Sequence, residues 1–96
     1  MSEGPRTVRV RIAGRVQGVS YRAWTCQAAG RLGLAGWVRN RIDGSVEALF
    51  AGRPEDVAVM LEACRRGPRL ARVDTVSVEE APGHDPAPGF LQRETV

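Results

Sequence analysis

Apolar and polar residues alternate near the start of the chain. Val8, Val10 and Ile12 are separated by Arg9 and Arg11, and this period of two predicts a β-strand with one apolar face. Similar patterns predict four further strands, at 36–41, at 45–51, around Val76 and Val78 on one apolar face, and at 90–93. Asp43-Gly44 predicts the turn that makes the second and third strands a hairpin.

Two helices are predicted between the strands. Ser20 is the expected N-cap of the first, which runs to about Leu32 with Gly33 as a left-handed C-cap. Pro54 begins the second, and Gly67-Pro68 ends it. Both helices carry apolar stripes at helical spacing: Tyr21, Trp24, Thr25, Ala28, Ala29 and Leu32 in the first, and Val57, Met60, Leu61 and Cys64 in the second.

The resulting order of elements is βαββαβ with a short extra C-terminal strand. This order predicts an α+β fold of the ferredoxin-like kind, in which an antiparallel sheet carries both helices on one face. Residues 7–96 are expected to form one domain, and residues 1–6 a flexible tail.

The loop between the first strand and the first helix contains two glycines, in the sequence GRVQGVSYR at 14–22. Backbone N–H groups in such a loop, together with the unpaired donors of the first helical turn, favour an anion. The candidate phosphate-binding amides are those of Arg15, Val16, Gln17, Gly18, Val19, Ser20 and Tyr21. Arg22 can fold back over the loop and bind two phosphate oxygens with its guanidinium. Taken alone, such a segment is more often a surface arginine beside an ordinary turn.

A second motif lies downstream, Gly36-Trp37-Val38-Arg39-Asn40, and continues to Gly52. With both motifs in this order and at this separation, the chain resembles the acylphosphatase family over about residues 7–93. Residues 12–22 and 36–52 follow the family pattern, except that Tyr21 replaces the usual Phe or Met. We expect little consequence from this departure, because Tyr is still a large ring that can anchor the start of the helix. The resemblance also implies the ferredoxin-like topology.

The predicted topology brings the two motifs together. A right-handed crossover makes the first two strands run in the same direction, so their C-terminal ends lie at one edge of the sheet. Arg22 follows the first of these strands, and Asn40 lies near the end of the second. If Val38 joins the core under the helices, then Asn40 shares its face and points toward the first helix. Both side chains would then meet at one pocket.

The resemblance implies hydrolysis of acyl phosphates to a carboxylate and inorganic phosphate, without metal or cofactor. In the implied mechanism the loop amides and Arg22 bind the phosphoryl group, Asn40 holds a water in line with the phosphorus, and the substrate phosphate accepts the water's proton. The chain has no Lys, and its single histidine, His84, lies in a Pro/Gly loop where we expect it to be solvated. An acyl phosphate suits such a chain, because its carboxylate leaves as a stable anion without a general acid.

The composition limits the partners. The net charge of +3 over 96 residues suits small anions but is too slight to indicate nucleic acid. Without an apolar run of about 20 residues or a signal peptide, we expect no membrane association and a cytoplasmic location. The family resemblance implies inhibition by inorganic phosphate or sulfate, and we expect a monomer. Cys26 and Cys64 are interpreted as small buried hydrophobes, not as a disulfide or metal site.

Three alternatives remain at this point. The first is a non-catalytic anion-binding module. The second is an RNA-binding module, because a basic face opposite the helices is expected from Arg9, Arg11, Trp37, Arg39 and Arg41. That face lacks the aromatic-rich strands of an RNA-recognition sheet, and Glu47 can pair with its arginines across strands. The third, an acylphosphatase-like domain of a larger carbamoyl-transfer protein, is disfavoured by the lack of a further domain in this sequence.

Overall fold

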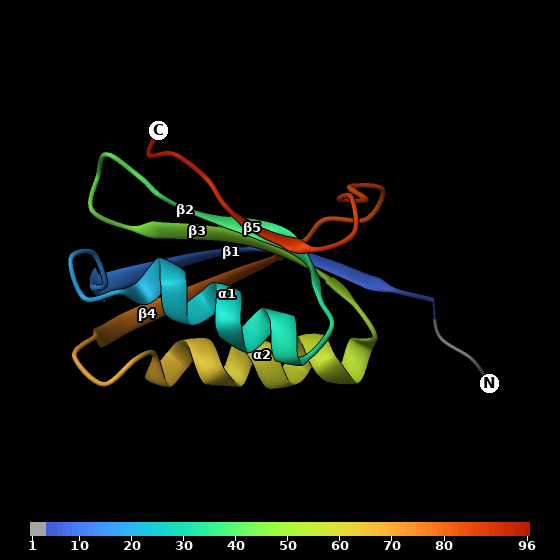
Figure 1. Ribbon diagram of the computed structural model, residues 1–96, viewed down its shortest axis with the longest axis horizontal. Helices are drawn as coiled ribbons and strands as arrows, with labels where there is room; N and C mark the ends of the chain where they lie inside the picture. Colours follow the sequence, from blue (N-terminus) through green and yellow to red (C-terminus); the bar gives the residue numbers. More distant parts are fainter. Residues whose placement is uncertain (1–3) are drawn as a thin grey trace.

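The structure, a computed structural model, describes residues 4–96 and confirms the expected order of elements (Figure 1). The strands and helices are β1 (Arg6–Arg15), α1 (Tyr21–Arg31), β2 (Ala35–Asn40), β3 (Val46–Gly52), α2 (Pro54–Arg66), β4 (Arg72–Glu80) and β5 (Phe90–Gln92). Of the expected N-terminal tail, residues 1–3 lie outside the described residues. The strand β1 already begins at Arg6, which pairs with Glu80 across the sheet at 2.8 Å.

The five strands form one sheet in the order β4-β1-β3-β2-β5, with both helices on the same face (Figure 1). The pairs β4-β1, β1-β3 and β3-β2 are antiparallel, as expected for a ferredoxin-like sheet. One edge departs from the expected antiparallel order, because β5 pairs parallel with β2. The chain reverses direction after β4, and β4 runs opposite to β2. The strand that follows the reversal therefore runs with β2, and the sheet is mixed.

The helix-covered face of the sheet holds the main core. Val8, Val10 and Ile12 of β1 are completely buried, which confirms the period of two in this segment. In α1 the buried residues are Tyr21, Thr25 and Ala29, and in α2 they are Val57, Met60 and Cys64. The apolar stripes predicted for both helices therefore face the sheet and fix the two helices on it.

Strand β4 is less buried than its apolar pattern suggests. Val76 is half-buried against the core, but Val78 is 38% exposed. Val78 does pair with the buried Val10, so it is on the expected face. Its exposure follows from position, because β4 is the outermost strand and has a neighbouring strand on one side only.

The start of α1 is fastened by Tyr21. Its ring is buried, and its hydroxyl donates a hydrogen bond to the carbonyl of Cys64 in α2 at 2.7 Å. Tyr21 therefore anchors the start of the helix as expected, and it adds a buried polar link that Phe or Met lacks. The Cys64 thiol is buried and free, and burial raises its pKa to about 12. Cys26 is also free but only half-buried.

Both expected caps of α1 are in place, with one difference in chemistry. Gly33 is left-handed at φ 69°, and the Leu34 N–H returns to the Ala29 carbonyl, as in a Schellman ending. Ser20 precedes the helix, but its side chain makes no cap hydrogen bond, and its backbone is left-handed at φ 65°. The donors of the first helical turn are therefore not satisfied by Ser20.

Candidate functional site

A pocket of about 340 Å³ lies where the β1–α1 loop meets the end of β2. Its lining residues are Val16, Gly18, Ser20, Tyr21, Arg22, Ala23, Asn40 and Gln92. The structure thus brings Arg22 and Asn40 to one pocket. Of the seven residues predicted to bind phosphate through their amides, Val16, Gly18, Ser20 and Tyr21 line this pocket, whereas Arg15, Gln17 and Val19 do not.

The sheet topology explains why Arg22 and Asn40 meet. Strands β1 and β2 run in the same direction with β3 between them, so both end at the same edge of the sheet. Val38 is completely buried under the helices, and Asn40 lies two residues further along the same face. Asn40 pairs with Val46 at the last position of the β2–β3 ladder. The asparagine is therefore carried by regular sheet and not by a loop.

The backbone N–H groups of residues 16–23 are the main polar feature of the loop. Within the described residues, none of them donates a hydrogen bond, and the first helical bond runs from the Trp24 N–H to the Ser20 carbonyl. Buried or partly buried N–H groups are rarely left without a partner. A run of free donors at the start of a helix is a favourable environment for an anion.

The loop is fixed by its side chains instead. Val16 and Val19 are buried in the core, and Gly18 adopts φ 74° between them. Gly14 at φ 131° lies at an irregularity in the β1–β4 ladder, and a Cβ there would collide with the Arg72 carbonyl. These positions turn the chain sharply from strand into loop without using the backbone donors of residues 16–23.

Arg22 is the cation of the pocket. One Nη atom donates to the carbonyl of Arg93 at 3.3 Å, and no carboxylate of the described residues pairs with the guanidinium. Its remaining N–H groups are therefore available to a bound anion. A guanidinium fork matches two phosphate oxygens at once.

Asn40 faces the same space from the sheet. Its side-chain amide makes no hydrogen bond to any described residue, while its backbone carbonyl accepts from the Val96 N–H at 3.2 Å. The main chain of Asn40 is thus fixed on both sides, and its side chain is free to bind a water molecule or a ligand.

Gln92 of β5 completes the lining and is missing from the sequence-based prediction. Phe90 stacks on Phe50 in the core, and Gln92 lies two residues further along the strand, on the same face. The alternation of Phe90, Leu91 and Gln92 indicates that face. The alternation does not predict which strand β5 pairs with. In the structure β5 pairs with β2, and Gln92 lies beside Val38.

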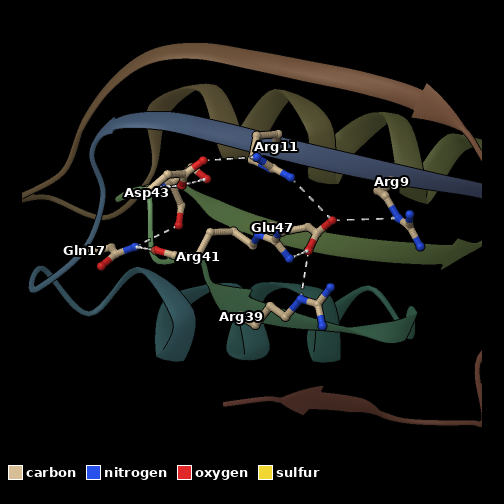
Figure 2. Close-up of polar contacts among 8 residues, drawn as sticks. Arg9, Arg11, Gln17, Arg39, Arg41, Asp43 and Glu47 are labelled. Atoms are coloured by element: carbon tan, nitrogen blue, oxygen red, sulfur yellow. Dashed lines mark hydrogen bonds and ion pairs between the residues drawn. The ribbon is translucent and has the colours of Figure 1, made fainter. Parts of the chain in front are cut away.

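The open face of the sheet carries four further arginines, Arg9, Arg11, Arg39 and Arg41 (Figure 2). The carboxylate of Glu47 is nearly buried and lies 2.8 Å from Arg39, 3.4 Å from Arg41, 3.8 Å from Arg11 and 4.0 Å from Arg9. This confirms the expected pairing across strands. The guanidinium of Arg39 also covers the Trp37 ring, at 4.6 Å from its centroid. The basic face therefore has an internal anion, in contrast to the pocket around Arg22.

A larger hollow of about 600 Å³ lies at another part of the surface, lined among others by Arg6, Thr7 and Glu80. Its arginine is paired with Glu80, so this hollow lacks a free cation comparable to Arg22. Among residues 4–96 no three His, Cys, Asp or Glu side chains gather as metal ligands, and none of the helices is long and apolar enough to cross a membrane. His84 is exposed, as expected.

Comparison with known proteins gives consistent matches. A family model described as acylphosphatase matches residues 8–91. The chain is 57% identical over 88 residues to an acylphosphatase of Rhodospirillum rubrum, an alignment that covers 92% of this chain and 96% of that protein. It is 53% identical over 88 residues to an acylphosphatase of Rhizorhabdus wittichii, covering 92% and 88%. The crystal structure of acylphosphatase from Bacillus subtilis matches with a TM-score of 0.88 at 34% identity, covering 92% of this chain and 98% of that one.

Proposed function

The chain belongs to the acylphosphatase family, and from this premise we propose that it hydrolyses acyl phosphates, without a metal ion, in the pocket between Arg22 and Asn40. The products are a carboxylate and inorganic phosphate. The observation that carries the assignment to this pocket is the run of N–H groups at residues 16–23 that have no acceptor among residues 4–96, opposite the side-chain amide of Asn40.

The phosphoryl group binds to the loop. The free amides of the loop residues that line the pocket, Val16, Gly18, Ser20 and Tyr21, and the guanidinium of Arg22 surround its non-bridging oxygens. The negative charge spread over these oxygens in the transition state is stabilised by the same donors. Amides that already point at an anion need no reorganisation during the reaction, so positioning supplies much of the rate.

Asn40 binds the attacking water. Its side-chain oxygen accepts a hydrogen bond from the water and holds it in line with the phosphorus and the leaving oxygen. The water's proton passes to an oxygen of the substrate phosphate. The P–O bond to the acyl group breaks, and the carboxylate leaves with the bonding electron pair. A carboxylate is a stable anion at neutral pH, so no general acid is needed.

Hydrolysis of benzoyl phosphate, followed by ultraviolet absorbance, tests this function. We expect wild-type protein to turn over the substrate in EDTA, to be inhibited competitively by inorganic phosphate or sulfate, and to lose most turnover in Asn40→Ala. Loss of activity in EDTA would contradict metal independence. Phosphate binding without turnover would instead indicate an acylphosphatase fold that acts as an anion-binding module.

We also propose that the protein is a cytoplasmic monomer that does not bind nucleic acid. The internal pairing of Glu47 with Arg9, Arg11, Arg39 and Arg41 supports the last point, because these arginines already have an anion. Light scattering tests the monomer, and fractionation of the source cells tests the location. A salt-dependent shift of RNA in a gel would contradict the claim on nucleic acid.

A further inference from the structure

Gln17 lies in the loop between β1 and α1 (residues 16–20), the proposed phosphate loop, but its side chain is bonded outside the pocket. Its Nε2 atom donates to the carbonyl of Arg41 at 2.7 Å and to the carbonyl of Ser45 at 2.9 Å (Figure 2). An amide NH₂ group has two donors, and both are used here. Within the described residues these are the only side-chain hydrogen bonds made by residues 16–20.

The two acceptors belong to the turn between β2 and β3, which is held without Gln17. The Asp43 carboxylate accepts from the Ser45 N–H at 2.9 Å and from the Ser45 hydroxyl at 2.6 Å. The Arg41 N–H donates to the Ser45 carbonyl, and the Gly44 N–H donates to the Arg41 carbonyl. Gln17 is therefore not needed to form this turn.

The loop has no comparable backbone support. Its amides from residue 16 onward have no acceptor among the described residues, so its position depends on buried side chains and on Gln17. Val16 and Val19 anchor it toward the core. Gln17 is the polar link that ties it to the element carrying Asn40.

The positions of the acceptors give this link a role in the reaction. Arg41 directly follows Asn40, and Ser45 directly precedes Val46, the ladder partner of Asn40. Gln17 thus binds the two backbone carbonyls that flank the Asn40–Val46 pair, one just after β2 and one just before β3. We propose that Gln17 is a positioning residue that sets the distance between the phosphate loop and Asn40. This inference rests on the proposed function, since it concerns the alignment of water with the bound phosphoryl group.

The test uses Gln17→Leu, which has a similar length but no donor, and Gln17→Glu, which accepts but cannot donate when ionised. Each is made in the wild type and in Asn40→Ala. Gln27→Leu is the matched control, because Gln27 is an exposed glutamine of α1 without a side-chain hydrogen bond among the described residues. The measurements are kcat for benzoyl phosphate, the inhibition constant of inorganic phosphate, and urea unfolding.

We expect Gln17→Leu and Gln17→Glu to lower kcat by about tenfold or more, because misplacement of the reacting groups by about 1 Å can cost about a hundredfold. The inhibition constant of phosphate should change by less than about threefold, since the loop and Arg22 remain together. In Asn40→Ala the Gln17 substitutions should lower the residual kcat by less than about twofold, because the aligned water is already lost. Gln27→Leu should resemble the wild type.

Equal losses of kcat in both backgrounds would overturn the inference, as would normal kcat in the Gln17 variants. A rise in the inhibition constant as large as the fall in kcat would also overturn it, because Gln17 would then serve phosphate binding. Unfolding of both variants would show a purely structural role. Absence of turnover in the wild type is a separate result, which overturns the proposed function and this inference with it.

Discussion

The β1–α1 loop and the β2–β3 turn are adjacent segments that are joined through Gln17, and they use their backbones in opposite ways. In the turn at 41–45, the backbone N–H groups of Arg41, Ile42 and Gly44 pair with backbone carbonyls, and that of Ser45 pairs with the Asp43 carboxylate. In the loop at 16–23, no backbone donor has a partner among the described residues. The loop is instead held by buried valines, by Tyr21 and by Gln17. A segment that binds an anion through its amides must be fixed by other groups, and this loop is fixed by side chains.

The same contrast applies to the arginines. Those near the turn, such as Arg39 and Arg41, share the carboxylate of Glu47. Arg22, beside the loop, has only a carbonyl at 3.3 Å among the described residues. Composition alone does not separate these arginines, because all of them are counted equally in the net charge. Their local partners decide which one is available to a substrate.

Removal of the cation from the loop side should have the largest effect. We expect Arg22→Ala to lower kcat/KM by about a thousandfold and to weaken phosphate binding by about a hundredfold, because the transition-state charge loses its fork. Kinetics with benzoyl phosphate and calorimetry with inorganic phosphate measure the two effects. Arg22→Lys is the control and should show a smaller loss, since it keeps the charge without the fork. Phosphate affinity equal to that of the wild type in Arg22→Ala would contradict the placement of the anion.

Removal of the Asn40 amide from the sheet side of the pocket should affect turnover but not phosphate binding. We expect Asn40→Ala to lower kcat by about a hundredfold and to change phosphate affinity by less than about twofold, because in the proposed mechanism Asn40 binds the water and not the phosphoryl oxygens. The same two measurements apply. If Asn40→Ala lost as much phosphate affinity as Arg22→Ala, the division of labour between the two sides of the pocket would be wrong.

The ion pairs that Glu47 makes with Arg41 and the neighbouring arginines should contribute to the free energy of unfolding. We expect Glu47→Gln to lower the free energy of unfolding by about 2 kcal/mol, less than for a fully buried pair because the arginines are partly exposed. Urea unfolding measures it. Glu79→Gln is the matched control, since Glu79 is an exposed carboxylate of β4 without an ion pair among the described residues, and it should change little. Equal stabilities of the two variants would show that the Glu47 cluster contributes nothing.

Low pH should remove the stabilisation of the β2–β3 turn by Asp43, and we expect this effect on the free energy of unfolding to be smaller than that of Glu47→Gln. The hydroxyl and then the N–H of Ser45 hold the pKa of Asp43 below its ordinary value of 3.8. Asp43 therefore contributes stability above that value and loses it as pH falls through the lowered pKa. We expect the difference in unfolding free energy between wild type and Asp43→Ala to shrink below about pH 4, as followed by urea unfolding from pH 6 to pH 2. A difference that stays constant with pH would mean that the Asp43 charge is not responsible.

Much of the fold was accessible from the sequence because its signals are local. The alternation around Val10 and the helical stripes through Thr25 and Met60 are set by residues only a few positions away in the sequence. All three residues are buried, as expected. The burial of a strand is less local. Val78 continues the apolar pattern, yet its exposure depends on the place of β4 at the edge of the sheet.

The sequence alone was enough to predict the order of elements, the covered face of each helix, and the motifs that place Arg22 shortly after the end of β1 and Asn40 at the end of β2. Periodicity, caps and turn residues act over short distances, so they can be read without the rest of the molecule. Three features required the folded structure: β5 runs parallel to β2, Gln92 lines the pocket, and Gln17 donates hydrogen bonds to the β2–β3 turn. These contacts join segments far apart in the chain, and their partners are fixed by the packing of the whole sheet.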